Sequence, residues 1–328
     1  MRVGIVGDGI GGRTLYRLLK MQGLSVELYG QEKYTKCNIR PCGFGTSVSC
    51  VNLVKKLGIS PEDYVLRYDD YIMISGRRIK GALCWIDKPK LLEAMATDIR
   101  YDKPEISDYY IVVDATGIAR AYSPAIPKLD DKNGTSYQHR VIPRNHVAPA
   151  FDVIKGGYIW TIPLGKMETH IGGGSTILPS SEVEQLVFNR VQDMKPDEIV
   201  CSCSEPIRLS GPIFPVVNGK FVMVGESAGL VVPFGGAGIH TAIESAIILA
   251  NQIHKGDIEG YNKAIRRRFG WLSGVRKIVD SAERGHISLL SLGTSYRALR
   301  YQGLKPTLID LLHIRRNLIE ANKSEIVI

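Results

Sequence analysis

Short strand-like segments followed by turn residues recur along the chain, and they predict the buried strands of an α/β fold. Residues 3–6 form the first segment, 25–29 the second and 111–113 the third, and a further one begins at residue 222. Short apolar runs bounded by turn signals are typical of strands that are buried on both faces. Residues 13–21 read as a helix directly after the first segment, in the order of a strand–turn–helix unit.

Two longer segments, 68–80 and 158–176, alternate between apolar and polar positions. A period of two predicts strands of an antiparallel sheet. Residues 172–174 are three glycines inside the second segment, but the alternation continues through them and no helix signal follows, so they do not form a nucleotide-binding turn. Elsewhere, residues 87–90 are predicted to open a helix over 91–98, because they include Pro89 and proline is favourable at the start of a helix.

The turn after the first strand has glycines spaced as G-x-G-x-x-G, at Gly7, Gly9 and Gly12. Gly7 permits the tight turn, Gly9 leaves space for a pyrophosphate beside the backbone, and Gly12 lets the helix pack closely on the strand. The first amides of the helix then face the phosphates. A glycine-rich turn in an ordinary α/β protein is the alternative, but the position between a strand and a helix favours dinucleotide binding.

The contact to the adenosine ribose is less clear in the sequence. An acidic residue at the end of the second strand usually supplies it. Gly30 occupies that position, Glu27 comes too early and Glu32 comes two residues late. Glu32 is therefore the candidate ribose ligand, and a solvated carboxylate in the turn is the alternative.

A second glycine-rich region follows the strand that begins at residue 222. There a strand ends in a carboxylate, a loop without side chains can approach a flat ligand, and a helix begins with its amides facing that ligand. The strand at 111–113 ends in a third segment, Asp114-Ala115-Thr116-Gly117. The residues of the second region are Gly225, Glu226, Pro233, Gly235, Gly236, Gly238 and Ile239.

These three segments, in this order, resemble the motifs of the para-hydroxybenzoate-hydroxylase-like flavoproteins. The resemblance implies FAD as the cofactor, with Glu226 at the ribityl chain and the helix after Gly238 at the pyrimidine edge of the isoalloxazine. A helix N-terminus there stabilises the negative charge of the reduced flavin. The strand that carries Asp114 and Gly117 passes near the cofactor in that family. Glu226 stands where the family has Asp.

Two further segments resemble the geranylgeranyl reductases among these FAD-dependent oxidoreductases. Residues 40–47 are similar to their P-C-G loop, and 158–163 to their Y-x-W-x-F-P motif, with Ile162 in place of Phe. The resemblance implies reduction of isolated carbon–carbon double bonds in a prenyl chain of a lipid or lipid precursor. It assigns cofactor contacts to Arg40, Cys42, Gly43, Gly45 and Thr46, and substrate contacts to Tyr158, Trp160 and Pro163.

A prenyl alkene has no carbonyl to polarise, so its reduction needs a hydride at one carbon and a proton at the other. Cys42, Tyr158 and a bound water are the available proton donors. For Cys42 the alternative is packing or a bridge to Cys37, and for Tyr158 and Trp160, which share a strand face, it is ordinary sheet packing.

Composition agrees with an enzyme of more than one domain. The chain has 328 residues, 44% of them hydrophobic, with no charged leader and no apolar run long enough to cross a bilayer. We therefore expect a cytoplasmic protein. The spacing of the six cysteines does not match a zinc site, and we expect no metal.

Most of the net charge of +9 lies in the tail, because residues 255–328 hold fourteen Lys or Arg against seven Asp or Glu. Leucines and aromatic residues are interleaved with these basic residues. The pattern suits peripheral contact with the anionic inner face of a membrane, or an acidic protein electron donor. A solvated surface whose apolar side packs on the protein is the alternative. No recognition module for nucleic acid accompanies the charge.

No second nucleotide-binding motif is visible, so the electron donor is expected to dock transiently. NADPH and reduced ferredoxin are the two possibilities, and the basic tail favours ferredoxin by electrostatic steering. Two alternatives to a prenyl reductase stay open: a flavin-dependent monooxygenase acting on a small aromatic or apolar substrate, and a flavin-binding protein with a non-redox role.

The predicted fold is α/β, with a Rossmann-type FAD-binding domain, a mostly antiparallel β-sheet substrate domain and a C-terminal helical lobe. The FAD-binding domain is expected to be discontinuous and to comprise residues 1–60, 83–150 and 216–256. The substrate-binding sheet would comprise 61–82 and 151–215, and the basic lobe 257–328.

Overall fold

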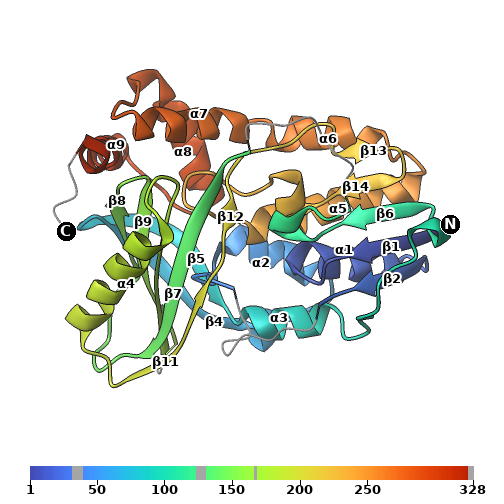
Figure 1. Cartoon of the computed structure of the whole chain (residues 1–328), viewed down its shortest axis with the longest axis horizontal. Helices are drawn as coiled ribbons and strands as arrows, with labels where there is room; N and C mark the ends of the chain where they lie inside the picture. The colour runs from blue at the N-terminus through green and yellow to red at the C-terminus, as the bar shows by residue number, and fades with distance from the viewer. Residues whose placement is uncertain (32–39, 123–130, 166–167, 324–328) are drawn as a thin grey trace.

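The computed structural model describes residues 1–31, 40–122, 131–165 and 168–323. Within them the chain forms two β-sheets with helices packed around both (Figure 1). The five-stranded sheet lies near the N-terminus, at the right of the view, and the larger sheet extends to the left. The predicted α/β fold class is confirmed.

The smaller sheet has the strand order β13-β14-β6-β1-β2. Four of its strands run parallel, and β13 pairs antiparallel with β14. These four strands are the ones that the apolar segments predicted. The strand bounds are β1 Arg2–Val6, β2 Ser25–Tyr29, β6 Ile111–Asp114, β13 Val217–Asn218 and β14 Phe221–Met223.

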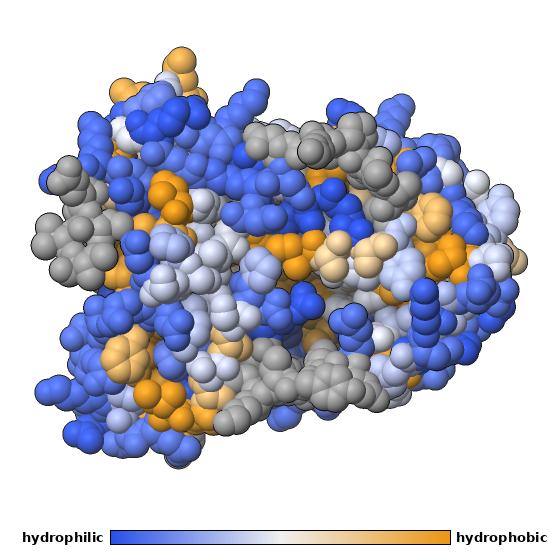
Figure 2. Space-filling view, viewed as in Figure 1, coloured by the Kyte–Doolittle hydropathy of each residue, from blue (hydrophilic) through white to orange (hydrophobic). Residues whose placement is uncertain are grey.

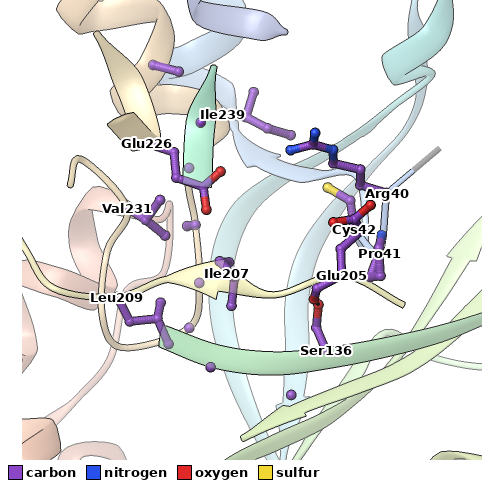
Figure 3. Close-up of a pocket in the computed structure, with 18 of the residues that line it drawn as sticks. Arg40, Pro41, Cys42, Ser136, Glu205, Ile207, Leu209, Glu226, Val231 and Ile239 are labelled. Carbon is purple, nitrogen blue, oxygen red and sulfur yellow. Dashed lines mark hydrogen bonds between the residues drawn. The ribbon is translucent and has the colours of Figure 1, made fainter. Parts of the chain in front are cut away.

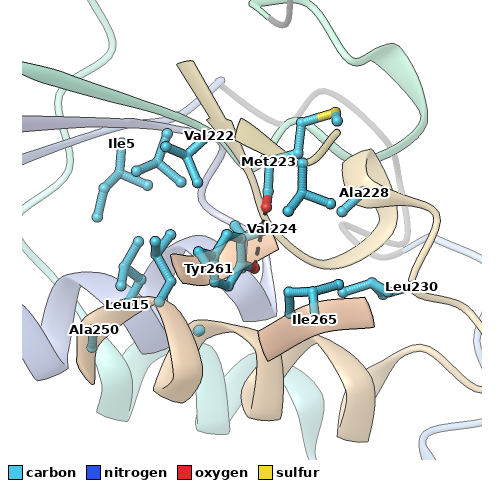
Figure 4. Packing of buried hydrophobic residues seen from close by; sticks show 14 of the residues in the cluster. Ile5, Leu15, Val222, Met223, Val224, Ala228, Leu230, Ala250, Tyr261 and Ile265 are labelled. Carbon is cyan, nitrogen blue, oxygen red and sulfur yellow. Dashed lines mark hydrogen bonds between the residues drawn. The ribbon is translucent and has the colours of Figure 1, made fainter. Parts of the chain in front are cut away.

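Helices α1 (Ile10–Met21) and α5 (Ile239–Lys255) pack together against this sheet. Helix α6 (Gly260–Phe269) closes the same apolar core, in which Tyr261 is fully buried (Figure 4). The Tyr261 hydroxyl donates a hydrogen bond to the carbonyl oxygen of Met223 at 3.2 Å. The core therefore fixes the ends of β1 and β14 relative to the starts of α1 and α5.

The larger sheet follows the order β11-β7-β10-β9-β8-β4-β5-β3, and β12 pairs with β7 beside it. Its pairings are antiparallel except the short one between β4 and β8. Both alternating segments of the sequence lie in it. The strand bounds are β3 Gly45–Ser47, β4 Val65–Ile74, β5 Arg77–Ile86, β7 Asn133–Ile142, β8 Ala150–Ile154, β9 Gly157–Leu164, β10 Glu168–Ser175, β11 Glu198–Ser204 and β12 Ile207–Arg208.

Strand β7 comes from the range 83–150 that we expected in the cofactor-binding domain, yet it pairs in the larger sheet. It pairs along much of its length with β10 and β11, and its burial alternates over residues 133–138. The alternation that predicted strands lies in two other segments, 68–80 and 158–176.

Three helices lie on or between the sheets: α2 (Val48–Lys55), α3 (Lys88–Met95) and α4 (Ser180–Met194). The Asp87 side chain caps α3 by accepting the amide of Lys90 at 3.1 Å, so this helix starts and ends three residues earlier than predicted. Helix α4 covers one face of β7 and β10 through a small apolar cluster around Val187.

The C-terminal part is helical, as expected, and covers the upper side of the molecule in Figure 1. Helix α9 packs against β8 and β5, which brings the end of the chain onto the larger sheet. The remaining helices are α7 Leu272–Glu283, α8 Leu292–Tyr301 and α9 Leu308–Lys323. Short 3-10 turns occupy η1 Pro61–Asp63, η2 Ile106–Asp108, η3 Gly117–Ala119, η4 Gly225–Ala228 and η5 Leu289–Ser291.

Candidate functional site

A cavity of about 980 Å³ lies between the two sheets and beneath the C-terminal helices (Figure 3). It is lined by the ends of the parallel strands, one face of the larger sheet and the inner sides of α7, α8 and α9. In the space-filling view, apolar side chains are visible in a hollow near the centre of a largely polar face (Figure 2). The volume suits a cofactor together with a substrate group.

The turn between β1 and α1 forms the first wall of the cavity. Gly7 has a φ of +112°, and a Cβ there would overlap the carbonyl of Ala115. A Cβ on Gly12 would overlap the carbonyl oxygen of Gly7. Around Gly9, by contrast, there is open space within 4 Å of a Cβ position. Gly7 and Gly12 therefore permit the close packing, and Gly9 leaves the space that a ligand can occupy.

The start of α1 is suited to a phosphate group. Gly9 is its N-cap and has no side chain to cap the helix, and no acidic residue lies in the first turn. The first amides of the helix are thus available to an anion. These observations fit the pyrophosphate of a dinucleotide.

Helix α5 begins at the cavity in the same way. Its N-cap is Gly238, again without a side-chain cap or an acidic first turn. Gly235 and Gly236, with φ of +95° and +62°, shape the loop before it. Ile239 lines the cavity at the first position of the helix. The two helix starts give the cavity two positively polarised ends.

Glu226 projects into the cavity close to the η3 turn (Figure 3). Its Oε1 accepts the amide of Arg208 at 2.9 Å, and its Oε2 is 3.1 Å from where a Cβ on Gly117 would be. Burial raises the pKa of the Glu226 carboxyl. Gly117, with a φ of +67°, is therefore needed both for the turn and for space beside Glu226.

Asp114 is completely buried and organises the loop that follows β6. Its Oδ1 accepts the amide and the hydroxyl of Thr116, at 3.0 and 2.7 Å, and its Oδ2 accepts the amide of Tyr122 at 2.9 Å. Thr116 and Tyr122 line the cavity, whereas Asp114 does not. Asp114 therefore holds these two cavity-lining residues in place through hydrogen bonds from the buried side of the wall.

The Cys42 loop lies against the larger sheet. The amide of Cys42 donates to Oε1 of Gln138 at 3.0 Å, and the indole Nε1 of Trp160 donates to the same oxygen at 3.2 Å. The ring nitrogen Nδ1 of His170 is 2.9 Å from the carbonyl oxygen of Cys42. Cys42 is a free thiol that lines the cavity. It therefore forms no disulfide, and the alternative of a bridge from Cys42 is wrong.

Tyr158 and Trp160 lie side by side in the cavity wall, with ring centroids 5.8 Å apart. The Tyr158 hydroxyl donates to the carbonyl oxygen of Gly235 at 2.6 Å. Burial, followed by the nearby Cys42, raises the pKa of the Tyr158 phenol. Its proton is therefore held by the Gly235 carbonyl and is hard to remove.

The structure brings most of the predicted site residues together around this one cavity. Gly12, Asp114 and Pro163 are not on its lining, and Glu32 is outside the described residues. The predicted residues that do line it are Gly7, Gly9, Arg40, Cys42, Gly43, Gly45, Thr46, Gly117, Tyr158, Trp160, Gly225, Glu226, Pro233, Gly235, Gly236, Gly238 and Ile239.

Glu27 is engaged elsewhere, as its early position in the strand indicated. Its carboxylate pairs with Arg2 at 2.6 Å and with Arg100 at 2.9 Å, and it accepts a hydrogen bond from Tyr109. Hydrogen bonds from Tyr109, then from Arg2 and Tyr29, lower the pKa of Glu27 to about 2. Gly30, where an acidic residue was expected, lines the cavity.

Three polar residues at the site had no signal in the sequence. Gln138 and His170 are 1% exposed and hold the Cys42 loop, and His240 lines the cavity at the start of α5. The His240 ring stacks on Tyr301 with centroids 4.4 Å apart. Gln138 and His170 lie on strands far from residue 42 in the sequence, so only the sheet register brings them to it.

A Gln138→Leu variant is expected to lower the free energy of unfolding by about 2–4 kcal/mol, because two buried N–H groups lose their shared acceptor. Chemical denaturation measures this, and the fluorescence of Trp160 reports the local change. Gln185→Leu on the exposed face of α4 is the matched control. Equal stability of the two variants would contradict the anchoring role.

The C-terminal helices also line the cavity. Residues from α7 and α9 face inward, although the sequence had indicated mainly a basic surface for this part. Helix α7 is tied to the body by Lys132, which pairs with Asp280 at 3.0 Å and with Glu283. The inward-facing apolar residues of this part are Ile278, Val279, Ala282, Leu299, Leu304, Ile314 and Leu318.

Two further features bear on function. Over the described ranges there is no cluster of three or more His, Cys, Asp or Glu side chains arranged to hold a metal ion. Among the helices built from those same ranges, none combines the length and the apolar character needed to cross a membrane.

Comparison with curated proteins gives distant relatives, and no family model matches the chain. An uncharacterized protein of Methanocaldococcus jannaschii is 24% identical, with 85% of this chain and 91% of that protein covered. A digeranylgeranylglycerophospholipid reductase of Methanothermobacter thermautotrophicus is 29% identical over 35% of this chain and 32% of its own length. A menaquinone reductase of Mycolicibacterium smegmatis is 24% identical over 45% of this chain and 37% of its own length.

Solved structures share the fold over almost the whole chain. A geranylgeranyl bacteriochlorophyll reductase-like protein of Thermoplasma acidophilum superposes with a TM-score of 0.70, at 18% identity, covering 97% of this chain and 99% of that one. The probable FAD-dependent monooxygenase PqsL of Pseudomonas aeruginosa has a TM-score of 0.61 at 15% identity, with 92% and 98% covered. A tryptophan 6-halogenase of Streptomyces toxytricini superposes with a TM-score of 0.64 at 15% identity, covering 90% of this chain and 82% of that one.

Proposed function

We propose that this chain, which is similar to geranylgeranyl reductase-like FAD-dependent oxidoreductases, saturates carbon–carbon double bonds in the prenyl chain of a lipid or lipid precursor. The observation that carries this proposal is the apolar part of the cavity. It lies between the larger sheet and the C-terminal helices, and a long chain without polar groups would fill it. Each buried methylene contributes about 0.8 kcal/mol to such binding.

The apolar walls come from several elements that are distant in the sequence. Strands β4, β5, β8 and β9 supply one side, and α9 with the segment before it supplies the other. A small polar substrate would leave most of these side chains without a partner. The apolar residues of this part are Ile72, Ile74, Leu83, Phe151, Val153, Trp160, Ile162, Leu304, Ile314 and Leu318.

FAD fits the residues that surround the rest of the cavity. The free amides at the start of α1 would hold its pyrophosphate, and those at the start of α5 would face the isoalloxazine. When bound and reduced, the flavin supplies a hydride to one carbon of the alkene. The protein must then supply a proton to the other carbon.

Cys42 is better placed than Tyr158 to give that proton. Its thiol is free and lines the cavity. The Tyr158 proton is bound to the carbonyl oxygen of Gly235 at 2.6 Å, and burial raises the pKa of the phenol. Tyr158 and Trp160 would instead wall the slot that holds the alkene.

Hydrogenation of a defined lipid tests the proposal. Enzyme loaded with FAD and reduced anaerobically with dithionite is expected to increase the mass of a digeranylgeranyl lipid by one H₂ per double bond. The saturated lipid should stay unchanged. Cys42→Ser should slow hydrogenation by about 100-fold, the usual contribution of a general acid, whereas Cys50→Ser, a buried thiol away from the cavity lining, should not. Absence of any mass gain would refute the proposed activity.

The electron donor follows from a second measurement. We propose NADPH or reduced ferredoxin, with the basic C-terminal part favouring the acidic protein by electrostatic steering. Anaerobic stopped-flow mixing with each donor compares how fast the flavin colour bleaches. Rapid bleaching by NADPH alone would make ferredoxin unnecessary.

A flavin-dependent monooxygenase is the second candidate, because solved structures with this fold include the probable FAD-dependent monooxygenase PqsL. It predicts a hydroxylated product and substrate-dependent oxygen uptake. A flavin-binding protein without a redox role predicts a bound flavin that none of the donors reduces.

We propose in addition that the C-terminal part contacts an anionic membrane surface from the cytoplasmic side. Leu289 and Leu290 are 59% and 96% exposed on η5, and apolar side chains protrude over the connection between α7 and α8 (Figure 2). Leu308 and Ile309, each 63% exposed, begin α9. Basic residues of the same part would add attraction to anionic headgroups.

Leu290→Asp is expected to weaken co-sedimentation with vesicles that contain anionic phospholipid by about tenfold, because a leucine side chain contributes about 1.5–3 kcal/mol when buried in the interface. Tyr110→Asp, at an exposed position directly before β6 and outside the C-terminal part, is the control. Binding of wild-type protein that is equal on neutral and anionic vesicles would argue against the electrostatic part.

A further inference from the structure

Two free thiols line the candidate cavity from different parts of the chain. Cys42 belongs to the loop before β3, and Cys203 lies on β11. Both are partly exposed to the cavity, unlike the buried thiols of Cys50 and Cys84. The proposed reaction gives no role to Cys203, although its thiol lines the same cavity as that of Cys42.

The sheet register sets where the Cys203 side chain points. Gln138 on β7 is directly opposite Cys203 on β11 and directly opposite Gly172 on β10. Directly paired residues project from the same face of a sheet. Gly172 has no side chain, and a Cβ there would overlap the Trp160 ring. That ring lies over Gly172, and its Nε1–H donates to the side-chain oxygen of Gln138. Cys203 therefore projects from the face on which Gln138 contacts the Cys42 loop.

The backbone of Cys42 is held against this face at two points. Its amide donates to Gln138 at 3.0 Å, and its carbonyl oxygen is 2.9 Å from Nδ1 of His170 in the neighbouring row of the sheet. Gly43 lies so close that a Cβ would be 3.2 Å from Ile162. The loop is thus fixed in place next to the edge strand that carries Cys203.

The two sulfur atoms are also near enough to influence one another electrostatically. Burial, and after it an electrostatic contribution from Cys42, raises the pKa of Cys203 to about 11. Strand β11 is at the edge of the sheet, and its pairing with β7 is irregular between Ile199 and Cys201. The irregularity disrupts the strand pairing locally and bends the edge strand there, and Cys201, two residues before Cys203 on β11, is itself disulfide-bonded.

We propose that Cys42 and Cys203 are a reversible thiol-oxidation site that closes to a disulfide within the cavity. The oxidant is a low-molecular-weight disulfide. One thiolate of the pair attacks it, forms a mixed disulfide and releases one small thiol. The second cysteine then displaces the other small thiol as the Cys42–Cys203 bond forms. Two protein S–H bonds are lost, and the small disulfide is reduced to two thiols.

Closure would remove the proton that Cys42 holds for the alkene, a consequence that rests on the proposed function. The bond itself does not rest on it. Because only the thiolate attacks and the pKa of Cys203 is high, exchange should be slow at neutral pH and faster at higher pH. Hydrogenation would thus depend on the thiol redox state.

Thiol counting on the flavin-loaded enzyme tests the site directly. After treatment with oxidised glutathione, wild-type protein is unfolded, alkylated and weighed. We expect two fewer alkylated thiols than in the untreated enzyme, and a cross-linked peptide that joins Cys42 to Cys203. Cys203→Ser and Cys42→Ser should instead stop at a mixed disulfide with glutathione on the remaining cysteine. Cys84→Ser, which removes a buried thiol, should still form the bridge.

Wild-type protein that keeps both thiols, or that carries two glutathione adducts without a bridge, would overturn the inference. The readout contains no prenyl substrate, so it separates this inference from the proposed function. If the bridge forms and no hydrogenation is ever seen, the proposed function fails while the site stands. If hydrogenation proceeds equally before and after bridge formation, Cys42 is not its proton donor.

Discussion

Gly12→Ala is expected to yield a protein that retains no flavin and is destabilised by about 3 kcal/mol or more. The added Cβ would overlap the carbonyl oxygen of Gly7 and lie 3.2 Å from the side chain of Ala115, and neither the β1–α1 turn nor the end of β6 can give way. The turn must open, and the amides at the start of α1 then lose their alignment toward the phosphates. Absorbance of copurified flavin and chemical denaturation measure the two effects.

Gly293→Ala is the matched control for this substitution. Gly293 lies in α8, its φ is not positive, and a Cβ there meets nothing within 4 Å. Alanine at an exposed helical position without strain stabilises by about 0.5–1 kcal/mol. A Gly12→Ala protein that copurifies with a full complement of flavin would show that the close packing of this turn is not required.

The dinucleotide turn was readable from sequence because its requirement is local. Within six residues, Gly7 and Gly12 must lack side chains for the backbone to pack, and Gly9 must lack one for a ligand to approach. The same holds for the loop before α5, where positive φ values at Gly235 and Gly236 select glycine. Such constraints act on residue type and therefore leave a pattern in the sequence.

The support of the Cys42 loop could not be predicted in this way. Gln138 and His170 come from two different strands, and they meet Cys42 only because β7 and β10 pair in one register. A shift of that register by one residue would turn both side chains to the opposite face. A buried glutamine inside an alternating strand has no local feature that marks it as an anchor.

The C-terminal helices show a similar limit. Spacing identifies an apolar face of a helix, but it does not identify the partner of that face. Ile314 and Leu318 of α9 face the cavity, whereas Leu308 on the same helix is exposed to solvent. An apolar side that packs on the protein was the alternative in the sequence analysis, but the spacing did not show that this side faces the cavity.

Asp114 is completely buried and does not line the cavity. The resemblance placed Asp114 near the cofactor, but its carboxylate is turned inward and accepts three hydrogen bonds from Thr116 and Tyr122. Asp114→Asn keeps the volume and replaces one acceptor oxygen by a donor. The side-chain NH₂ group then faces either the amide and hydroxyl of Thr116 or the amide of Tyr122, each of which donates to Asp114 in the wild-type protein. We expect the free energy of unfolding to fall by about 2–3 kcal/mol.

Because Thr116 and Tyr122 line the cavity, the same variant should also bind FAD at least about tenfold more weakly. Fluorescence titration of the flavin-free protein measures this affinity. Asp108→Asn makes the same chemical change at an exposed carboxylate that pairs with Arg2 at 3.5 Å, and it should alter neither quantity by more than about 0.5 kcal/mol. If Asp114→Asn lowers stability but leaves FAD affinity at the wild-type value, the loop after β6 folds independently of the cofactor and does not contribute to its binding.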